Sequence, residues 1–312
     1  MERPRSSTPP AAMIWNRSVH NAFTDLARFK GNWYCVFRES SEHMRGVGRI
    51  RLLRSRNCER WESLRLFSQT GVDLRDPKLS VTTQGRLMLL AGGTVFDGNQ
   101  YVGRQPRVAF SGDGIGWSRL ERVLEDGDWL WRVTWHVDCA YGITYRLKSA
   151  KIWTVSLVRS RDGLEYEELC DLGVNGKPNE ATIRFKANGS AIALVRREGG
   201  DKKGWVGTSA PPYTAWSWTS LPHRLGGPNF LILPTGEMWA GTRIIRGNEA
   251  RTWLGPLTET TFSPSVELPS GGDCSYPGMV WFRGRIWVSY YSSHEGKSNI
   301  YLARVPVAHQ PN

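Results

Sequence analysis

The chain has 312 residues, enough for one large all-β domain or two ordinary ones. Its formal net charge of +12 favours an anionic partner, but the basic residues form no concentrated run and no recognition-helix pattern, so we expect no nucleic acid partner. No apolar run of about 18 residues exists, which argues against a membrane partner, and residues 1–12 carry no apolar signal segment, which makes a cytoplasmic location the expectation.

Residues 1–12 are rich in Pro and Ser and predict a disordered tail. A single domain is expected over residues 13–308. Met13–Trp15 predicts a lone strand, which can close a ring by pairing with the last structural repeat and so remove an exposed sheet edge.

Six segments then share one pattern: a polar residue, a short apolar strand, a turn, and a second apolar strand that ends in a polar residue. They begin at Thr24, Arg75, Trp131, Asn179, Gly226 and Cys274. The spacing of about 50 residues matches one four-stranded propeller blade. The sequence therefore predicts an all-β fold, a six-bladed β-propeller of four-stranded antiparallel blades.

The turns predict a common register for the six hairpins. Five of the six contain a glycine, and the third has Asp138 instead. The positions seven residues after these turn residues are Arg38, Gly92, Tyr145, Arg196, Arg243 and Tyr291. We expect these six positions to be structurally equivalent.

Outer turns carry a second repeated signal. Ser111–Trp117 fits the pattern S-x-D-x-x-x-W, and Ser160–Tyr166 and Ser55–Trp61 are weaker copies. In such a turn the acidic side chain can accept backbone N–H bonds and the aromatic ring can pack between strands. We interpret the three turns as structural.

Residues 177–198 predict a hairpin with strands Ala181–Phe185 and Ala191–Val195. Glu180 and Arg196 then lie side by side at one edge of the sheet. Arg197 is expected on the opposite face, since neighbouring side chains alternate along a strand.

A six-fold repeat with these turns resembles the sialidase (neuraminidase) superfamily, over roughly residues 13–306. The resemblance implies that Tyr276 is a nucleophile and that Glu180 polarises it. It also implies that Arg196 and Arg243 bind a substrate carboxylate, and that Asp76, in the segment RDPKLSV, lies beneath the site.

Two features depart from the family pattern. The R-I-P arginine of the first strand is absent from the segment HNAFTDL, and Arg38 is the candidate to replace it. The acid/base aspartate has no clear counterpart in the loop FRESSEHMRG. Glu39, Glu42 or His43 could supply the proton, with Asp25 and Asp76 as nearby alternatives.

In a propeller, the starts of the innermost strands gather on one face of the axis. We expect the following residues there: Asp25, Arg38, Glu39, Asp76, Arg132, His136, Glu180, Arg196, Asn229, Arg243, Tyr276 and His294. Such a rim can be a site, or it can be a salt-bridged seal of the channel.

The expected function is that of a sialidase-like glycoside hydrolase that cleaves a terminal acidic sugar with retention. Tyr276 would be the nucleophile and Glu180 its base, and Asp76 or Glu39 would be the acid. Arginines would bind the sugar carboxylate. One alternative is a glycosidase that uses paired carboxylates on a neutral sugar, and another is a non-catalytic carbohydrate- or protein-binding propeller. No cofactor is expected, the five scattered cysteines show no metal-ligand spacing, and the oligomeric state stays open.

Overall fold

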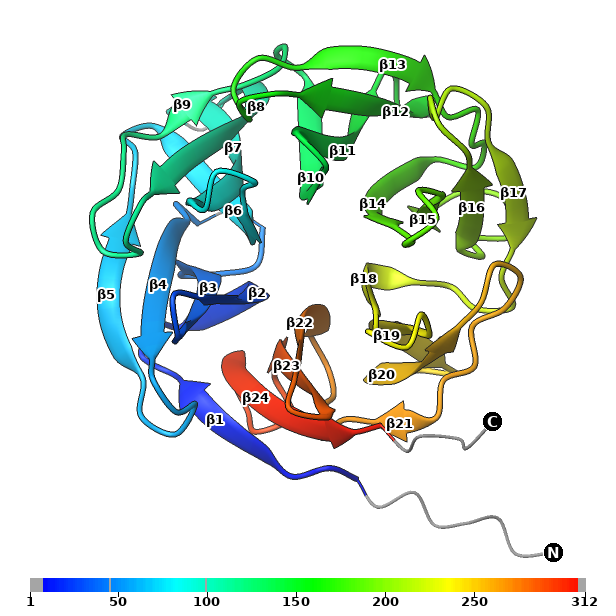
Figure 1. The fold of residues 1–312 in the computed structure, drawn as a ribbon. Helices are drawn as coiled ribbons and strands as arrows, with labels where there is room; N and C mark the ends of the chain where they lie inside the picture. The colour runs from blue at the N-terminus through cyan, green and yellow to red at the C-terminus, as the bar shows by residue number, and fades with distance from the viewer. Residues whose placement is uncertain (1–7, 45, 99, 308–312) are drawn as a thin grey trace, which may run out of the picture.

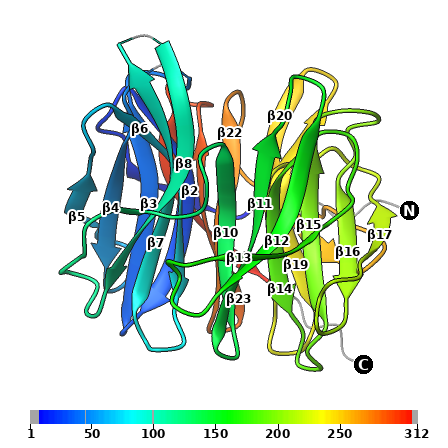
Figure 2. The same ribbon diagram turned by 90° about the horizontal axis from the view of Figure 1, so that it is seen from above.

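The computed structural model describes residues 8–44, 46–98 and 100–307. Their 24 strands form six four-stranded antiparallel sheets, and these residues contain no helix, hence none that could cross a membrane. Figure 1 shows the sheets arranged radially around an axis, and Figure 2 shows the blades from the side. The predicted six-bladed β-propeller is confirmed.

Each blade runs outward from the axis through four strands. The innermost strands are β2 (His20–Phe29), β6 (Val72–Val81), β10 (Asp128–His136), β14 (Pro178–Phe185), β18 (Gly226–Ile232) and β22 (Cys274–Phe282). The second strands are β3 (Asn32–Ser40), β7 (Leu87–Asp97), β11 (Cys139–Leu147), β15 (Ala191–Arg197), β19 (Met238–Arg246) and β23 (Arg285–Ser292). The third strands are β4 (Arg49–Ser55), β8 (Gln100–Ser111), β12 (Trp153–Ser160), β16 (Trp205–Ser209), β20 (Glu249–Leu257) and β24 (Asn299–Pro306). The outermost strands are β5 (Glu62–Phe67), β9 (Glu121–Arg122), β13 (Glu167–Asp171), β17 (Ser217–Ser220), β21 (Val266–Glu267) and β1 (Ala11–Trp15).

Strand β1 closes the ring. It pairs antiparallel with β24 and becomes the outermost strand of the sixth blade, as Figure 1 shows. The predicted pairing is confirmed, but the strand begins at Ala11, two residues earlier than expected, because Ala11 and Ala12 also pair with β24. Of the predicted tail and domain, residues 1–7 and 308 lie outside the described residues.

Each innermost strand contains a β-bulge in which two of its residues lie opposite one residue of the second strand. The bulged pairs are Phe23-Thr24, Asp76-Pro77, Trp131-Arg132, Asn179-Glu180, Gly227-Pro228 and Tyr276-Pro277. A bulge changes the direction of the side chains at its position. Because the six bulges lie at equivalent positions of the six inner strands, this change of direction occurs at the same level along the propeller axis.

The bulges also provide a test of the predicted structural equivalence of the six positions. Arg38, Gly92, Arg243 and Tyr291 each pair with the residue just before a bulge, as expected. In the third and fourth blades the equivalent residues are Thr144 and Arg197, so the prediction is off by one there. In the fourth blade this shift sets Arg196 directly opposite the bulge that contains Glu180.

The outer turns make the hydrogen bonds predicted for them. Asp113 Oδ1 accepts the backbone N–H groups of Ile115 (2.8 Å) and Gly116 (2.9 Å). Asp162 and Asn57 do the same in the two weaker copies. These side chains organise turns on the outer part of the blades and have a structural role.

Neighbouring blades pack closely where β22 crosses β2. A Cβ atom on Gly278 would lie 2.3 Å from the backbone nitrogen of Leu26, and backbone cannot move aside as a side chain can. We expect Gly278→Ala to lower the free energy of unfolding by about 3 kcal/mol. Gly112→Ala is the control, since a Cβ there meets nothing within 4 Å. Urea unfolding curves check this, and equal midpoints for the two variants would contradict the packing argument.

Candidate active site

A cavity of about 990 Å³ opens on the axis at the level of the bulges. Five bulge residues from four inner strands line it, namely Phe23, Asp76, Asn179, Glu180 and Tyr276. Much of the remaining wall is aromatic or cationic: Phe96, Tyr101, Trp129, Tyr145, Trp153, Arg75, Arg104 and Arg196. Of the twelve residues expected at the rim, four line this cavity, namely Asp76, Glu180, Arg196 and Tyr276.

Tyr276 and Glu180 are in direct contact. The phenol Oη donates a 2.6 Å hydrogen bond to Glu180 Oε1, while the Gly227 backbone N–H donates to Oε2 at 2.8 Å. Gly227 also makes room for the tyrosine, because a Cβ there would lie 2.9 Å from the Tyr276 ring. Three bulges thus fix the position of one carboxylate and one phenol.

Arg196 completes the chain of contacts. Its Nη1 lies 2.7 Å from Glu180 Oε1, and it also forms an ion pair with Glu198. Glu198 in turn accepts from Arg224 Nη2 at 2.6 Å. Arg197 faces the other side of β15, where it binds Asn175 and Asp201, as the alternation of the strand predicts.

The pKa values of the pair diverge. Burial raises the pKa of Tyr276 well above its ordinary value, and the charge of Glu180 raises it further. Burial would also raise the pKa of Glu180, but the charge of Arg196 and the hydrogen bonds from Arg196 and Tyr276 outweigh burial and hold it below its ordinary value. At neutral pH the phenol therefore keeps its proton beside an ionised carboxylate that can accept it.

Asp76 stands across the bulge of the second blade. Burial raises the pKa of its carboxyl above the ordinary value, against the opposing charges of Arg75 and Lys78. It lines the cavity and its backbone has φ of 48°, a conformation that costs a non-glycine residue on the order of 1–3 kcal/mol. A partly buried carboxyl with a raised pKa is suited to donate a proton.

Lys78 lies buried beneath Asp76 and was not anticipated from the sequence. Its ammonium donates to the carbonyls of Asp76 (3.3 Å) and Pro77 (3.1 Å) and lies 4.4 Å from the centre of a Trp131 ring. Burial, with the charge of Arg132, lowers its pKa to about 8. A lysine directly after the Asp76-Pro77 pair on the inner strand was the only available signal.

Asp25, Arg132 and Asn229 do not line the cavity, although they lie near the axis. Arg132 donates to both carboxylate oxygens of Asp25, at 2.8 and 3.0 Å. The same carboxylate also accepts the backbone N–H of Leu79. Asn229 accepts from Arg184 at 3.0 Å and donates to the Pro277 carbonyl at 2.9 Å. These hydrogen bonds join inner strands of different blades and match the channel-sealing alternative for these three residues.

Two further arginines also lie behind the wall. The Arg38 side chain is 0% exposed and donates to Asp73 and to the carbonyls of Glu42 and Gly46. Arg243 donates to the Cys274 carbonyl at 3.1 Å, and its charge opposes the rise in the pKa of Tyr276. Of the predicted carboxylate-binding arginines, the structure brings only Arg196 to the cavity wall.

Three predicted residues lie elsewhere. Glu39 accepts from Trp15 and Arg51 on the side of the first blade. His136 stacks on Phe185, 4.1 Å between centroids, because it ends β10 at the turn and not at the bulge. His294 is exposed after β23 and contacts Ser292 and Tyr301. Of the acid candidates Glu39, Glu42 and His43, only His43 lines the cavity.

Sequence reasoning missed Arg75 and Arg104 as cavity residues. Arg75 precedes Asp76, and simple alternation would send the two to opposite faces, but the bulge brings both to the cavity. Arg104 comes from β8, a third strand, and stacks on the rings of Tyr145 (5.0 Å) and Trp129 (5.6 Å). No inner-strand pattern could have found it.

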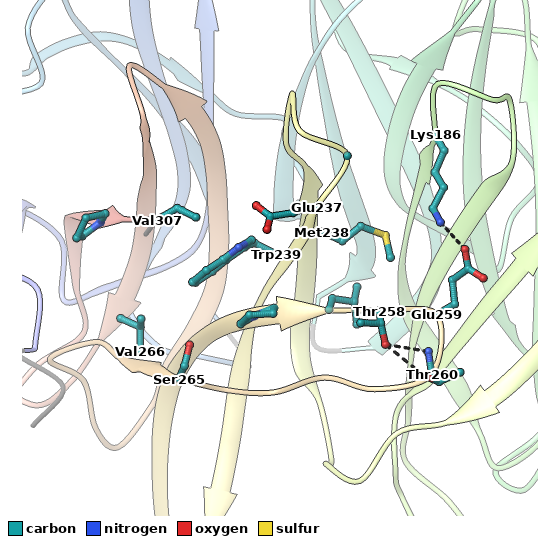
Figure 3. Close-up of a pocket in the computed structure, with 14 residues that line it drawn as sticks. Lys186, Glu237, Met238, Trp239, Thr258, Glu259, Thr260, Ser265, Val266 and Val307 are labelled. Atoms are coloured by element: carbon teal, nitrogen blue, oxygen red, sulfur yellow. Dashed lines mark hydrogen bonds and ion pairs between the residues drawn. The ribbon is translucent and has the colours of Figure 1, made fainter. Parts of the chain in front are cut away.

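A second cavity, of about 910 Å³, lies at the turn end of the fourth to sixth blades. Figure 3 shows Trp239 at its centre and the ion pair between Lys186 and Glu259 at one side. Its lining residues include no tyrosine, so it lacks the phenol–carboxylate pair of the axial cavity.

No family model matches the sequence, and no curated protein matches it. Among solved structures, a protein of unknown function from Dyadobacter fermentans is similar with a TM-score of 0.84 and 17% identity, over 98% of this chain and 100% of that one. A Trypanosoma rangeli sialidase in complex with the inhibitor DANA has a TM-score of 0.73 and 10% identity, over 96% of this chain but 60% of the sialidase. An α-L-arabinofuranosidase from Fusarium graminearum in complex with an iminosugar inhibitor has a TM-score of 0.73 and 12% identity, over 96% and 98% of the two chains.

At these identities the likeness is one of fold. The predicted resemblance to the propeller of the sialidases is confirmed, and an α-L-arabinofuranosidase and an α-L-arabinanase are similar in fold with TM-scores of 0.73 and 0.71.

The depressed pKa of Lys78 predicts a pH-dependent stability. Its folded pKa of about 8 lies below the ordinary 10.5, so the unfolded chain binds more protons between these pH values and stability rises with pH there. The difference amounts to on the order of 3 kcal/mol. We expect Lys78→Met to remove this rise in urea unfolding measured from pH 7.5 to 10.5. The control Lys148→Met, at an exposed position, should keep the rise in stability with pH. If the free energy of unfolding rises with pH in Lys78→Met as it does in the wild type, the rise does not come from Lys78.

Proposed function

We propose that the protein is a retaining glycoside hydrolase that acts on a terminal acidic sugar. The observation that carries the proposal is the hydrogen-bonded chain of Tyr276, Glu180 and Arg196 on the wall of the axial cavity. A tyrosine held at 2.6 Å from an ionised carboxylate is a nucleophile beside its base.

The chemistry proceeds in two steps. Tyr276 Oη attacks the anomeric carbon as its proton passes to Glu180, and Asp76 gives its proton to the departing glycosidic oxygen. The resulting tyrosyl glycoside is then opened by water, whose proton goes to the Asp76 carboxylate, while Glu180 returns its proton to the tyrosine. The opposite pKa shifts of Asp76 and Glu180 prepare one as the acid and the other as the acceptor.

Charge and shape favour an acidic sugar. A neutral phenol suits an anomeric centre that bears a carboxylate, because an anionic nucleophile would be repelled by it. Arg75, Arg104 and Arg196 line the cavity, and Arg104 Nη2 is buried without a hydrogen-bond partner among the described residues. The aromatic walls offer surfaces on which sugar rings stack.

A neutral sugar is the second candidate. Asp76 and Glu180 are two cavity carboxyls whose pKa values are shifted in opposite directions, which is the arrangement that paired-carboxylate glycosidases use. Here Glu180 would act directly and Tyr276 would serve to position it.

Replacement of the nucleophile separates the two candidates. We expect Tyr276→Phe to lower kcat by roughly 10³-fold or more, and Glu180→Gln by roughly 10²–10⁴-fold, on fluorogenic glycosides of keto-acid sugars. Tyr301→Phe, on the outer part of the sixth blade, is the matched control.

Turnover of a neutral sugar that is lost with Glu180→Gln but kept in Tyr276→Phe would favour the second candidate. Saturable sugar binding without turnover would favour a non-catalytic module and defeat both.

The raised pKa of Asp76 predicts the basic side of the pH profile. Activity should fall as pH rises through this pKa, because the acid must be protonated to act. In Asp76→Asn we expect that limb to disappear and kcat to drop most for leaving groups of high pKa. An unchanged basic limb would remove Asp76 from the role of acid.

A further inference from the structure

Three side chains from distant parts of the sequence converge beside the cavity. His20 begins β2, His43 lies in the loop after β3, and Asp273 immediately precedes β22. Asp273 Oδ2 lies 3.0 Å from His20 Nε2 and 2.7 Å from His43 Nδ1. One carboxylate oxygen is thus contacted by two imidazole nitrogens.

The geometry fits a bound cation. One ligand atom from each residue lies within 4.8 Å of the other two. Ligand atoms around a tetrahedral ion with bonds of about 2.1 Å stand about 3.4 Å apart. The two nitrogen–oxygen distances of 3.0 and 2.7 Å therefore need only a modest lengthening to admit the ion. Two imidazoles and a carboxylate are the ligands of zinc and related divalent transition metals.

The surroundings support ligand roles for these residues. Tyr291 Oη donates a 2.9 Å hydrogen bond to Asp273 Oδ1 and leaves Oδ2 to face the imidazoles. Outer hydrogen bonds of this kind orient metal-binding carboxylates. The Phe23 ring packs against both histidines, with centroids 5.1 and 6.2 Å away, and limits their rotation.

His20 has no competing contact for its other nitrogen. His20 Nδ1 is buried with no hydrogen-bond partner among the described residues. The hydrogen-bond partner of one ring nitrogen sets which nitrogen carries the proton. Within the part of the chain that the structure describes, Nδ1 has no acceptor or donor to fix it, so the ring can take the form in which Nε2 presents its lone pair to an ion.

The location suggests what an ion would do. His20 and His43 belong to the first blade and Asp273 to the sixth, the two blades between which the ring closes (Figure 1). His43 also lines the axial cavity. An ion here would tie the two blades together and hold the loop after β3 against the cavity.

We propose that His20 Nε2, His43 Nδ1 and Asp273 Oδ2 bind one divalent transition-metal ion, with a solvent molecule in the remaining position. The site is independent of the proposed glycosidase chemistry, because it uses neither Tyr276 nor Glu180. The competing interpretation is a plain hydrogen-bonded cluster that binds no metal.

The test uses Zn²⁺ as the probe on the full chain. Calorimetric titration at pH 7.5, after treatment with a chelator, should give one site per chain, and Zn²⁺ should raise the melting temperature. His43→Ala and Asp273→Asn should each raise the dissociation constant at least tenfold and abolish the thermal shift. Tyr291→Phe should weaken binding without abolishing it.

The control is His294→Ala, which removes another histidine of the sixth blade that takes no part in the cluster. This variant should bind Zn²⁺ with the affinity of the wild type. It tests whether an exposed histidine outside the cluster contributes to the measured binding. The His43 side chain is 41% exposed, so His43→Ala should fold even if Asp273→Asn does not.

Failure of the wild type to bind Zn²⁺, Mn²⁺, Co²⁺ or Ni²⁺ would overturn the proposal in favour of the hydrogen-bonded cluster. Equal Zn²⁺ affinity in the wild type and His43→Ala would also overturn it, because the ion would then bind at other residues. Neither result depends on enzyme activity.

Discussion

In each of the six innermost strands, one extra residue is inserted at the same level of the axis, and the side chains there turn toward the centre. Phe23, Asp76 and Tyr276 adopt positive φ at these insertions, with values of 62°, 48° and 53°. Such backbone is costly for residues with a Cβ and persists only where surrounding structure imposes it. The close packing of blade against blade imposes it here, and the cavity owes its chemistry to it.

The second theme is the competition between burial and specific partners. Glu180 and Asp76 are both carboxyls removed from water, yet their pKa values move in opposite directions. Glu180 has a guanidinium, a phenol and a backbone N–H in hydrogen-bond contact, and these outweigh its desolvation. Asp76 has only charges nearby, and burial prevails.

Beneath the cavity, charged groups satisfy one another. The bidentate pair of Arg132 with Asp25 and the contacts of Arg184 with Asn229 cross from blade to blade. Removing one partner from such a pair leaves a buried charge, so these residues belong to the stability of the channel. The axis therefore combines a hydrogen-bonded seal with an open cavity above it.

The sequence by itself determined the number of blades, the strand that closes the ring and the outer turns, because these follow from local periodicity and turn chemistry. The resemblance to the sialidases pointed to Glu180, Arg196, Tyr276 and Asp76, and the structure brings these four residues to the axial cavity. Only the tertiary structure decided which arginines reach the cavity, since a one-residue shift in a bulge exchanges the two faces of a strand. Arg104 from a third strand, the buried Lys78, and the meeting of His20, His43 and Asp273 depend on contacts between segments up to 253 residues apart, which no local pattern encodes.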